Sequence, residues 1–163
     1  MMNKLKGLIA TVMLMSSSTF AQSVQFNQVY SLDSQSARTL TDAAVTACQK
    51  IQHNIAVVVV DRGGNTLMAN RHETVGPHNL GAAEKKAYTA LSTKTATMLL
   101  SQNAHENKDA KNLTTLSNLL LLGGGVPVHY ENQVVGAIGV AGAGGAKNDH
   151  YCAETAVKSI FNP

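Results

Sequence analysis

Aromatic side chains are scarce in this sequence of 163 residues, which contains no tryptophan, three phenylalanines and four tyrosines. The formal net charge is only +3, and no cluster of lysine and arginine is interleaved with aromatic residues. Surfaces that bind nucleic acids usually show a basic patch together with such a pattern or a known motif. We therefore expect no nucleic acid among the partners of this protein.

Several catalytic and nucleotide-binding motifs are also missing. His72-Glu73 and His105-Glu106 are not followed by a second histidine at helical spacing, which excludes the H-E-x-x-H zinc motif. The chain has no G-x-S-x-G nucleophile elbow. It has no G-x-G-x-x-G motif, and its glycine-rich segment 142–147 lacks the G-K-[ST] ending of a phosphate-binding loop. No catalytic constellation is identified, which favours a non-enzymatic protein.

Cysteine is limited to Cys48 and Cys152. Without a C-x-x-C pair, the sequence encodes neither a thioredoxin-type site nor a cysteine zinc site. The two residues are either joined by a disulfide or buried as free thiols, because cysteine is often buried without bonding.

The N-terminus has the three parts of a secretory signal peptide. Lys4 and Lys6 precede an apolar run from Leu8 to Met15, and small residues follow up to Ala21. The run is too short to span a bilayer. We predict cleavage after Ala21, which leaves residues 22–163 as a single domain without a membrane span, in the periplasm or secreted. An oxidising compartment of this kind allows a disulfide to persist.

Hydrophobic periodicity predicts an α/β (α+β) domain, with no internal repeat and no linker. The expected elements are a helix over 33–53, strands over 55–60 and 66–72, a helix over 78–103, about three strands over 119–141, and a helix over 149–161. The strand over 134–141 is rich in glycine and alanine. Glycine weakens a strand unless another backbone or a ligand must come close. Either a helix or a second subunit packs on these small residues, or a ligand approaches them.

Three spaced blocks of the sequence resemble the GlcG/HbpS family, which includes the C-terminal domain of PduO-type proteins. They are IAVVVVDRGGNTLMANR, GPHNLGAAEKKAYTA and GGGVPVHYENQVVGAIGVAG, and Asp149 then opens a last helix. The resemblance covers Asp33 to Phe161. It implies a profilin-like fold, with a central antiparallel sheet of about five strands flanked by helices. It also implies a homo-oligomer, haem as a cofactor, a role in haem or iron handling, and terminal helices that pack together and bring Cys48 near Cys152.

Three positions depart from the family pattern. Asn132 stands at the usual hairpin-turn glycine, and it tolerates the positive φ that such a turn needs. Glu73 stands where an aspartate is usual. His78 stands where the family often has glutamine or serine, and this third difference bears on iron coordination.

The haem site is expected in the loop between the second strand and the second helix, which His72 and His78 flank. Loops on a rigid scaffold often carry binding sites, and imidazole is a common ligand of haem iron. We predict that His78 is the iron ligand, with His72 as the second choice. Arg71 and Lys86 are then the partners of the haem propionates. The alternative is that these side chains are structural or lie on a solvated face.

The other four histidines are expected at element ends or in solvent; they are His53, His105, His129 and His150. His129 points from the hairpin either to solvent or to a neighbouring subunit. The favoured function is an exported haem-binding protein that stores, buffers or transfers haem. The alternatives are a small-molecule-binding accessory or sensor domain with a partner protein, and an enzyme acting on an unidentified small metabolite.

Overall fold

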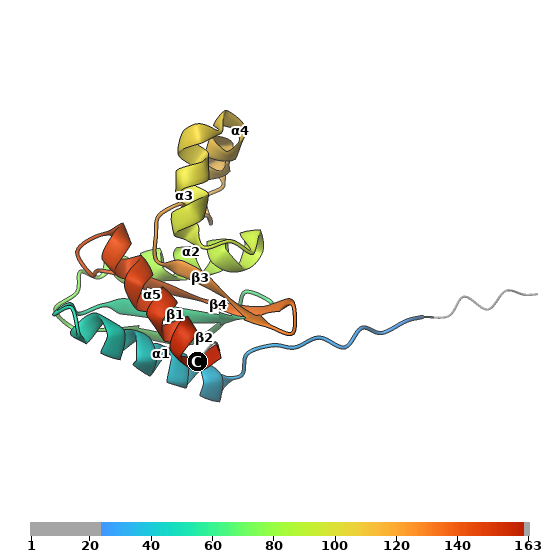
Figure 1. Ribbon diagram of the computed structural model, residues 1–163, viewed down its shortest axis with the longest axis horizontal. Coiled ribbons are helices and arrows are strands. Elements are labelled where there is room, and N and C mark those ends of the chain that lie inside the picture. The colour runs from blue at the N-terminus through green and yellow to red at the C-terminus, as the bar shows by residue number, and fades with distance from the viewer. Residues whose placement is uncertain (1–23, 162–163) are drawn as a thin grey trace, which may run out of the picture.

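The computed structural model describes residues 24–161, so the predicted signal peptide lies outside the described residues. Within that range the chain forms a mixed α/β domain around a four-stranded antiparallel sheet of order β2-β1-β4-β3 (Figure 1). The elements are α1 (Ser34–Gln49), β1 (Ala56–Asp61), β2 (Thr66–Arg71), α2 (His78–Thr93), α3 (Thr97–Glu106), α4 (Lys108–Lys111), a 3₁₀ turn (Asn112–Thr115), β3 (Gly125–Tyr130), β4 (Gln133–Ala141) and α5 (Ala146–Phe161). The predicted fold class is confirmed.

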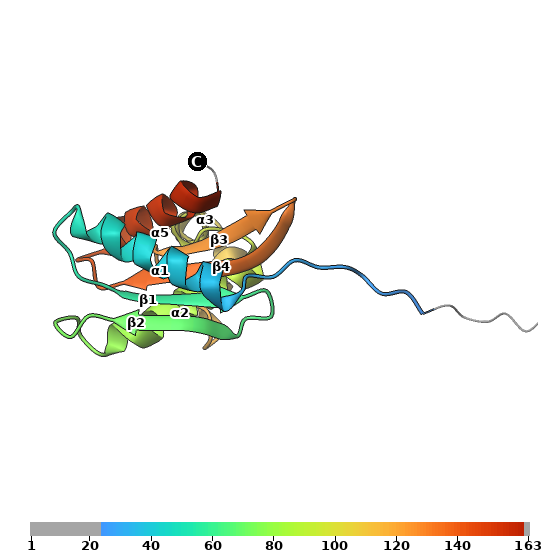
Figure 2. The same cartoon turned by 90° about the horizontal axis from the view of Figure 1, so that it is seen from below.

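Helices cover both faces of the sheet, as Figure 2 shows from below. Val57 and Val59 of β1 pack in the cluster that α1 and α5 complete. Val58 and Val60 pack on the opposite side, against the alanines of α2. A strand that is buried on both faces needs apolar residues at every position. This explains the uninterrupted valine run of β1.

A disulfide joins the two helices on the first face. Cys48 of α1 and Cys152 of α5 are bonded, with their Cα atoms 5.2 Å apart, and both are fully buried. The bridge spans 104 residues of sequence. In the chain-entropy model, closing a loop of that size stabilises the fold by about 5 kcal/mol. The packing of the terminal helices, implied by the family resemblance, is confirmed.

On the second face, α2 lies directly on the backbone of β3 and β4. A Cβ atom built on Gly139 would collide with the carbonyl oxygen of Ala83 and lie 2.6 Å from the backbone nitrogen of Ala87. A Cβ atom on Gly125 would collide with the carbonyl oxygen of Lys86. Of the two alternatives for the small residues of the hairpin, packing of a helix is the one observed at these positions.

The single helix predicted over residues 78–103 is wrong, because the chain breaks after α2. Lys94 adopts a left-handed conformation with φ of 54°, and its N–H donates to the carbonyl of Leu91 at 3.3 Å. The chain restarts as α3 at Thr97, whose buried hydroxyl donates to Leu122 O at 2.7 Å and accepts from Gly125 N at 2.8 Å. Helices α3 and α4 therefore project from the body as an arm (Figure 1).

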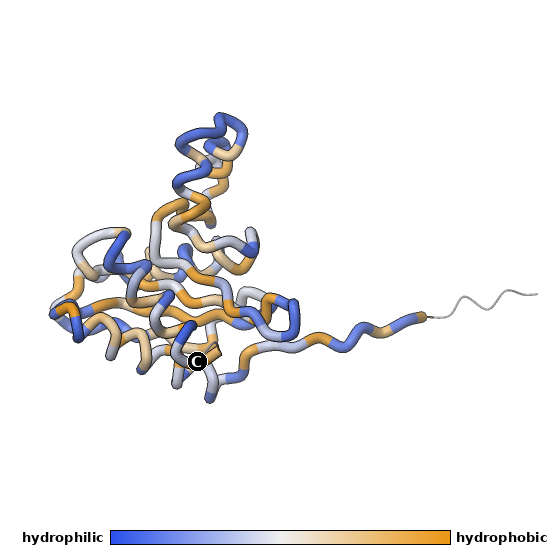
Figure 3. The backbone as a smooth tube through the Cα atoms, in the orientation of Figure 1, coloured by the Kyte–Doolittle hydropathy of each residue, from blue (hydrophilic) through white to orange (hydrophobic). Residues whose placement is uncertain are grey.

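The arm is apolar near its base and hydrophilic at its tip (Figure 3). Leu99 of α3 and Leu116, which directly follows the 3₁₀ turn at the end of the arm, each expose about half of their surface. In the described part of the chain, no helix is both long enough and apolar enough to cross a membrane.

The strand predicted at Leu119–Leu122 is absent, so residues 24–161 contain four strands rather than about five. The backbone there bonds locally, with Leu119 N donating to Leu116 O at 3.0 Å. Leu120 N donates to the hydroxyl of Thr89 on α2 at 2.8 Å. These bonds replace strand pairing, and the apolar run becomes a half-buried loop beside α2.

The contact between α2 and the sheet can be tested with two glycine variants. Gly139→Ala is expected to lower the free energy of unfolding by about 1–3 kcal/mol, because the added methyl group meets rigid backbone. Gly81→Ala is the matched control, since Gly81 lies in α2 with open space around it. It is expected to raise stability by up to about 1 kcal/mol through helix propensity. Urea denaturation measures the free energy of unfolding of both variants. Equal changes in the two variants would contradict the close contact between α2 and β4.

Candidate functional site

The loop between β2 and α2, where the sequence predicts the site, is held together by Arg71. Its Nη1 donates to the carbonyl oxygens of His72 at 3.2 Å, Glu73 at 3.5 Å and Val75. The guanidinium group thus shapes its own loop. A haem propionate would have to pair with its remaining N–H groups.

The two loop histidines have different surroundings. His72 is partly buried, and its Nδ1 lies 2.9 Å from the hydroxyl of Thr74. It lines a cavity of only about 40 Å³, together with His53. Ligand cavities usually measure roughly 300–1,000 Å³, so this one is too small for a macrocycle. His78 is exposed at the first position of α2.

Lys86 does not lie with the loop residues. Its side chain is 1% exposed, and Nζ donates to Asp149 Oδ2 at 2.7 Å and to Val140 O at 3.0 Å. Burial lowers the pKa of the Lys86 ammonium, and the neighbouring Asp149 carboxylate opposes part of that effect. The predicted pairing of Lys86 with a propionate is therefore corrected, because its ammonium faces the interior and already has two acceptors.

A larger depression follows β3, the outermost strand at one side of the sheet. We call it the edge groove; it lies between the start of the arm and α5 and has a volume of about 370 Å³. Its lining residues are Lys94, Thr95, Ala96, Leu99, Val126, Pro127, His129, Glu154, Val157 and Lys158. Pro127 lacks an N–H group, which suits an edge strand. Half of the lining side chains are apolar, and the lining also includes one imidazole, that of His129.

The position of His129 depends on an irregularity in β3. The register between β3 and β4 shifts between Val128 and His129. Such bulges change the direction of a side chain and often occur beside functional sites. Val128 is buried and His129 is exposed at the end of the groove.

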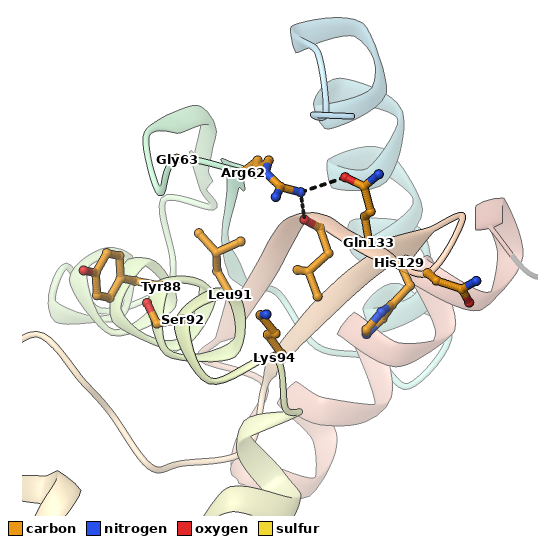
Figure 4. Close-up of a pocket in the computed structure, with 10 residues that line it drawn as sticks. Arg62, Gly63, Tyr88, Leu91, Ser92, Lys94, His129 and Gln133 are labelled. Atoms are coloured by element: carbon orange, nitrogen blue, oxygen red, sulfur yellow. Dashed lines mark hydrogen bonds between the residues drawn. The ribbon is translucent and has the colours of Figure 1, made fainter. Parts of the chain in front are cut away.

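A second cavity, which we call the turn pocket, shares two lining residues with the edge groove. Figure 4 shows the residues that line the turn pocket. It has a volume of about 450 Å³ and is lined by Arg62, Gly63, Tyr88, Leu91, Ser92, Lys94, His129, Asn132, Gln133 and Val134. The β1–β2 turn, the end of α2 and the β3–β4 hairpin form its walls. Lys94 and His129 line both cavities.

Sequence reasoning considered His129 but did not select it, and it did not single out Arg62 or Lys94. The alternation of apolar and polar residues in the hairpin correctly placed His129 outside the core. The bulge beside it has no recognisable signal in the sequence. Lys94 reaches both cavities because the helix breaks there, and the sequence predicted an unbroken helix.

A family model described as "Haem degrading protein HbpS-like" matches residues 32–158. The chain belongs to the HbpS-like family. This HbpS-like chain is 31% identical over 139 residues to an uncharacterised 15.0 kDa protein of Citrobacter freundii encoded in the dhaT-dhaS intergenic region. The match covers 80% of this chain and 92% of that protein.

Two solved structures have the same fold. A double mutant of HbpS from Streptomyces reticuli has a TM-score of 0.78 and 31% identity, over 91% of this chain and 99% of that chain. A PduOC–haem complex has a TM-score of 0.72 and 28% identity, over 82% of this chain and 96% of that chain. The family resemblance inferred from the sequence blocks is confirmed.

The buried ion pair predicts a large effect of Lys86→Met on stability. This variant leaves the Asp149 carboxylate buried beside an apolar side chain and should lower the free energy of unfolding by about 3–5 kcal/mol. The double variant Lys86→Met/Asp149→Asn should lose less than the sum of the two single variants, because the residues are coupled. Urea denaturation of all four proteins gives the coupling. Additive losses would show that the pair is not energetically linked.

Proposed function

We propose that this HbpS-like protein is an exported haem-binding protein that holds haem in the edge groove and stores, buffers or transfers it. Family membership and the similarity to a PduOC–haem complex support haem as the ligand. The observation that carries the choice of site is the edge groove itself. It combines apolar walls, one imidazole and two lysines in a cavity of suitable volume.

The groove residues fit the chemistry of haem. Its apolar macrocycle needs apolar walls, which Leu99, Val126 and Val157 provide. The 51% exposed surface of Leu99 would be covered by such a ligand, and burial of apolar surface contributes roughly 25 cal/mol per Å². When bound, haem would supply a redox-active iron centre.

Three polar residues have separate roles in this proposal. His129 would offer an imidazole nitrogen to the iron. Lys94 and Lys158 would pair with the two propionates. Lys158 Nζ contacts Glu154 Oε1 at 3.0 Å on the exposed face of α5. A surface ion pair of this kind contributes about 0–1 kcal/mol, so the lysine can exchange its partner at little cost.

The β2–α2 loop supplies the alternative ligand set. His78, or His72 after it, would then bind the iron, with Arg71 at a propionate. His78 is exposed and accessible, but it lines neither the edge groove nor the turn pocket. Matched histidine variants can therefore separate the two sites.

Haem titration followed by visible absorbance tests the function and the ligand together. His129→Ala is expected to shift or abolish the absorption band of bound haem and to weaken binding at least tenfold. His78→Ala should keep the wild-type spectrum, and His105→Ala on the exposed arm is the control. If His78→Ala loses the band and His129→Ala keeps it, haem binds at the β2–α2 loop instead. Absence of saturable binding by the wild type would refute the proposed function.

The family description favours haem degradation as a second candidate function. The same haem-loaded sample distinguishes the two. Under air and a reductant, a storage or transfer protein keeps its absorption band, whereas a degrading protein loses it without recovery when fresh oxidant is added. A stable band would argue against degradation.

Export and assembly complete the proposal. The buried Cys48–Cys152 disulfide suits an oxidising compartment such as the periplasm. The exposed leucines of the arm offer apolar area for a homo-oligomer and for a sensor or transport partner. Intact-mass measurement of periplasmic protein should give Gln22 as the first residue, and light scattering should give a multiple of the subunit mass. Retention of Met1 in cytosolic protein would contradict export. A monomer mass in light scattering would contradict the homo-oligomer.

A further inference from the structure

The turn pocket differs from the edge groove in its charge. Arg62, Lys94 and His129 line it, and its lining contains no aspartate or glutamate. Figure 4 shows Arg62 and Lys94 on two sides of Leu91. Positive charge gathered in a concave site without neutralising carboxylates attracts anions.

The guanidinium group of Arg62 is held in place on one side. Its Nη1 donates to Gln133 Oε1 at 3.0 Å and to Val134 O at 3.3 Å (Figure 4). The backbone N–H of Arg62 also donates to the hydroxyl of Ser31 at 3.3 Å. These bonds do not use Nη2 or Nε. A fixed planar guanidinium group with free N–H groups on one edge matches the two oxygens of a carboxylate.

The other walls restrict the size and polarity of the ligand. Leu91 and Val134 provide apolar surface, and Tyr88 adds an aromatic ring. Helix α2 ends at this pocket, and the carbonyl end of a helix disfavours an anion. Lys94, one residue beyond α2, supplies the opposite charge there. The favourable place for a carboxylate is thus beside Arg62, with its apolar body against Leu91 and with Lys94 on the other side of Leu91.

We propose that the turn pocket binds a small organic monocarboxylate with a short apolar body. Arg62 pairs with the carboxylate through two N–H groups, and Lys94 adds a second cation. Leu91 and Val134 cover the apolar part. The turn pocket shares Lys94 and His129 with the edge groove, but its occupation does not require haem.

Calorimetric titration of haem-free protein with benzoate tests the proposal. The wild type is expected to bind benzoate saturably at a single site. Arg62→Gln should weaken that binding at least tenfold, because an amide cannot replace the paired charged donors. Arg38→Gln is the matched control, since Arg38 is an exposed arginine on α1, away from the pocket lining. It should bind benzoate like the wild type. Circular dichroism checks that both variants are folded.

Other results would overturn the assignment. If benzoate binding is absent, or if Arg62→Gln and Arg38→Gln change it equally, the pocket is not a carboxylate site. If inorganic phosphate binds as tightly as benzoate, the pocket recognises charge alone. If one equivalent of haem abolishes benzoate binding, the pocket is a propionate subsite of the haem groove. The titration without haem is independent of the proposed haem function, so either proposal can fail alone.

Discussion

The constraint on which this fold depends is the direct contact of α2 with the backbone of β3 and β4. Gly125 and Gly139 permit that approach, because a methyl group at either position would meet helix backbone. At this separation the side chain of Lys86 is enclosed between the helix and the sheet. An enclosed ammonium group requires acceptors, and the chain supplies them from Val140 and Asp149. The small residues of the hairpin and the buried charge are therefore parts of one arrangement.

The ion pair connects the two faces of the sheet. Asp149 Oδ1 accepts from the backbone N–H of Ala143 at 2.9 Å, so the carboxylate that pairs with Lys86 also fixes the turn between β4 and α5. Cys152 lies less than one helical turn further along α5 and ties that helix to α1. A buried pair contributes little net stability compared with apolar residues of similar volume. Its effect here is on geometry, because it aligns α2, β4 and the start of α5.

Sequence patterns correctly predicted the elements that are held by a periodic row of apolar side chains. The valine run of β1 and the apolar stripes of α1 and α5 show their period locally. The break at Lys94 and the loop at Leu119–Leu122 depend instead on single hydroxyl groups, those of Thr97 and Thr89, which bond to distant backbone. Lys86 was predicted to pair with a haem propionate, whereas its partner is Asp149, which lies 63 residues away in the sequence. No local pattern indicates such a partner.

The proposed haem groove and the proposed carboxylate pocket meet at the β3–β4 hairpin, where Lys94 and His129 line both cavities. A single lysine cannot give its full charge to two anions. A carboxylate in the turn pocket would reduce the attraction of Lys94 for a propionate in the edge groove. Thermodynamic linkage then requires that haem weaken carboxylate binding by the same factor. Because Arg62 lines only the turn pocket and Lys158 only the edge groove, each site keeps one cation of its own. Each ligand should therefore weaken the binding of the other without excluding it. Lys94, at the break after α2, is the residue through which one site affects the other.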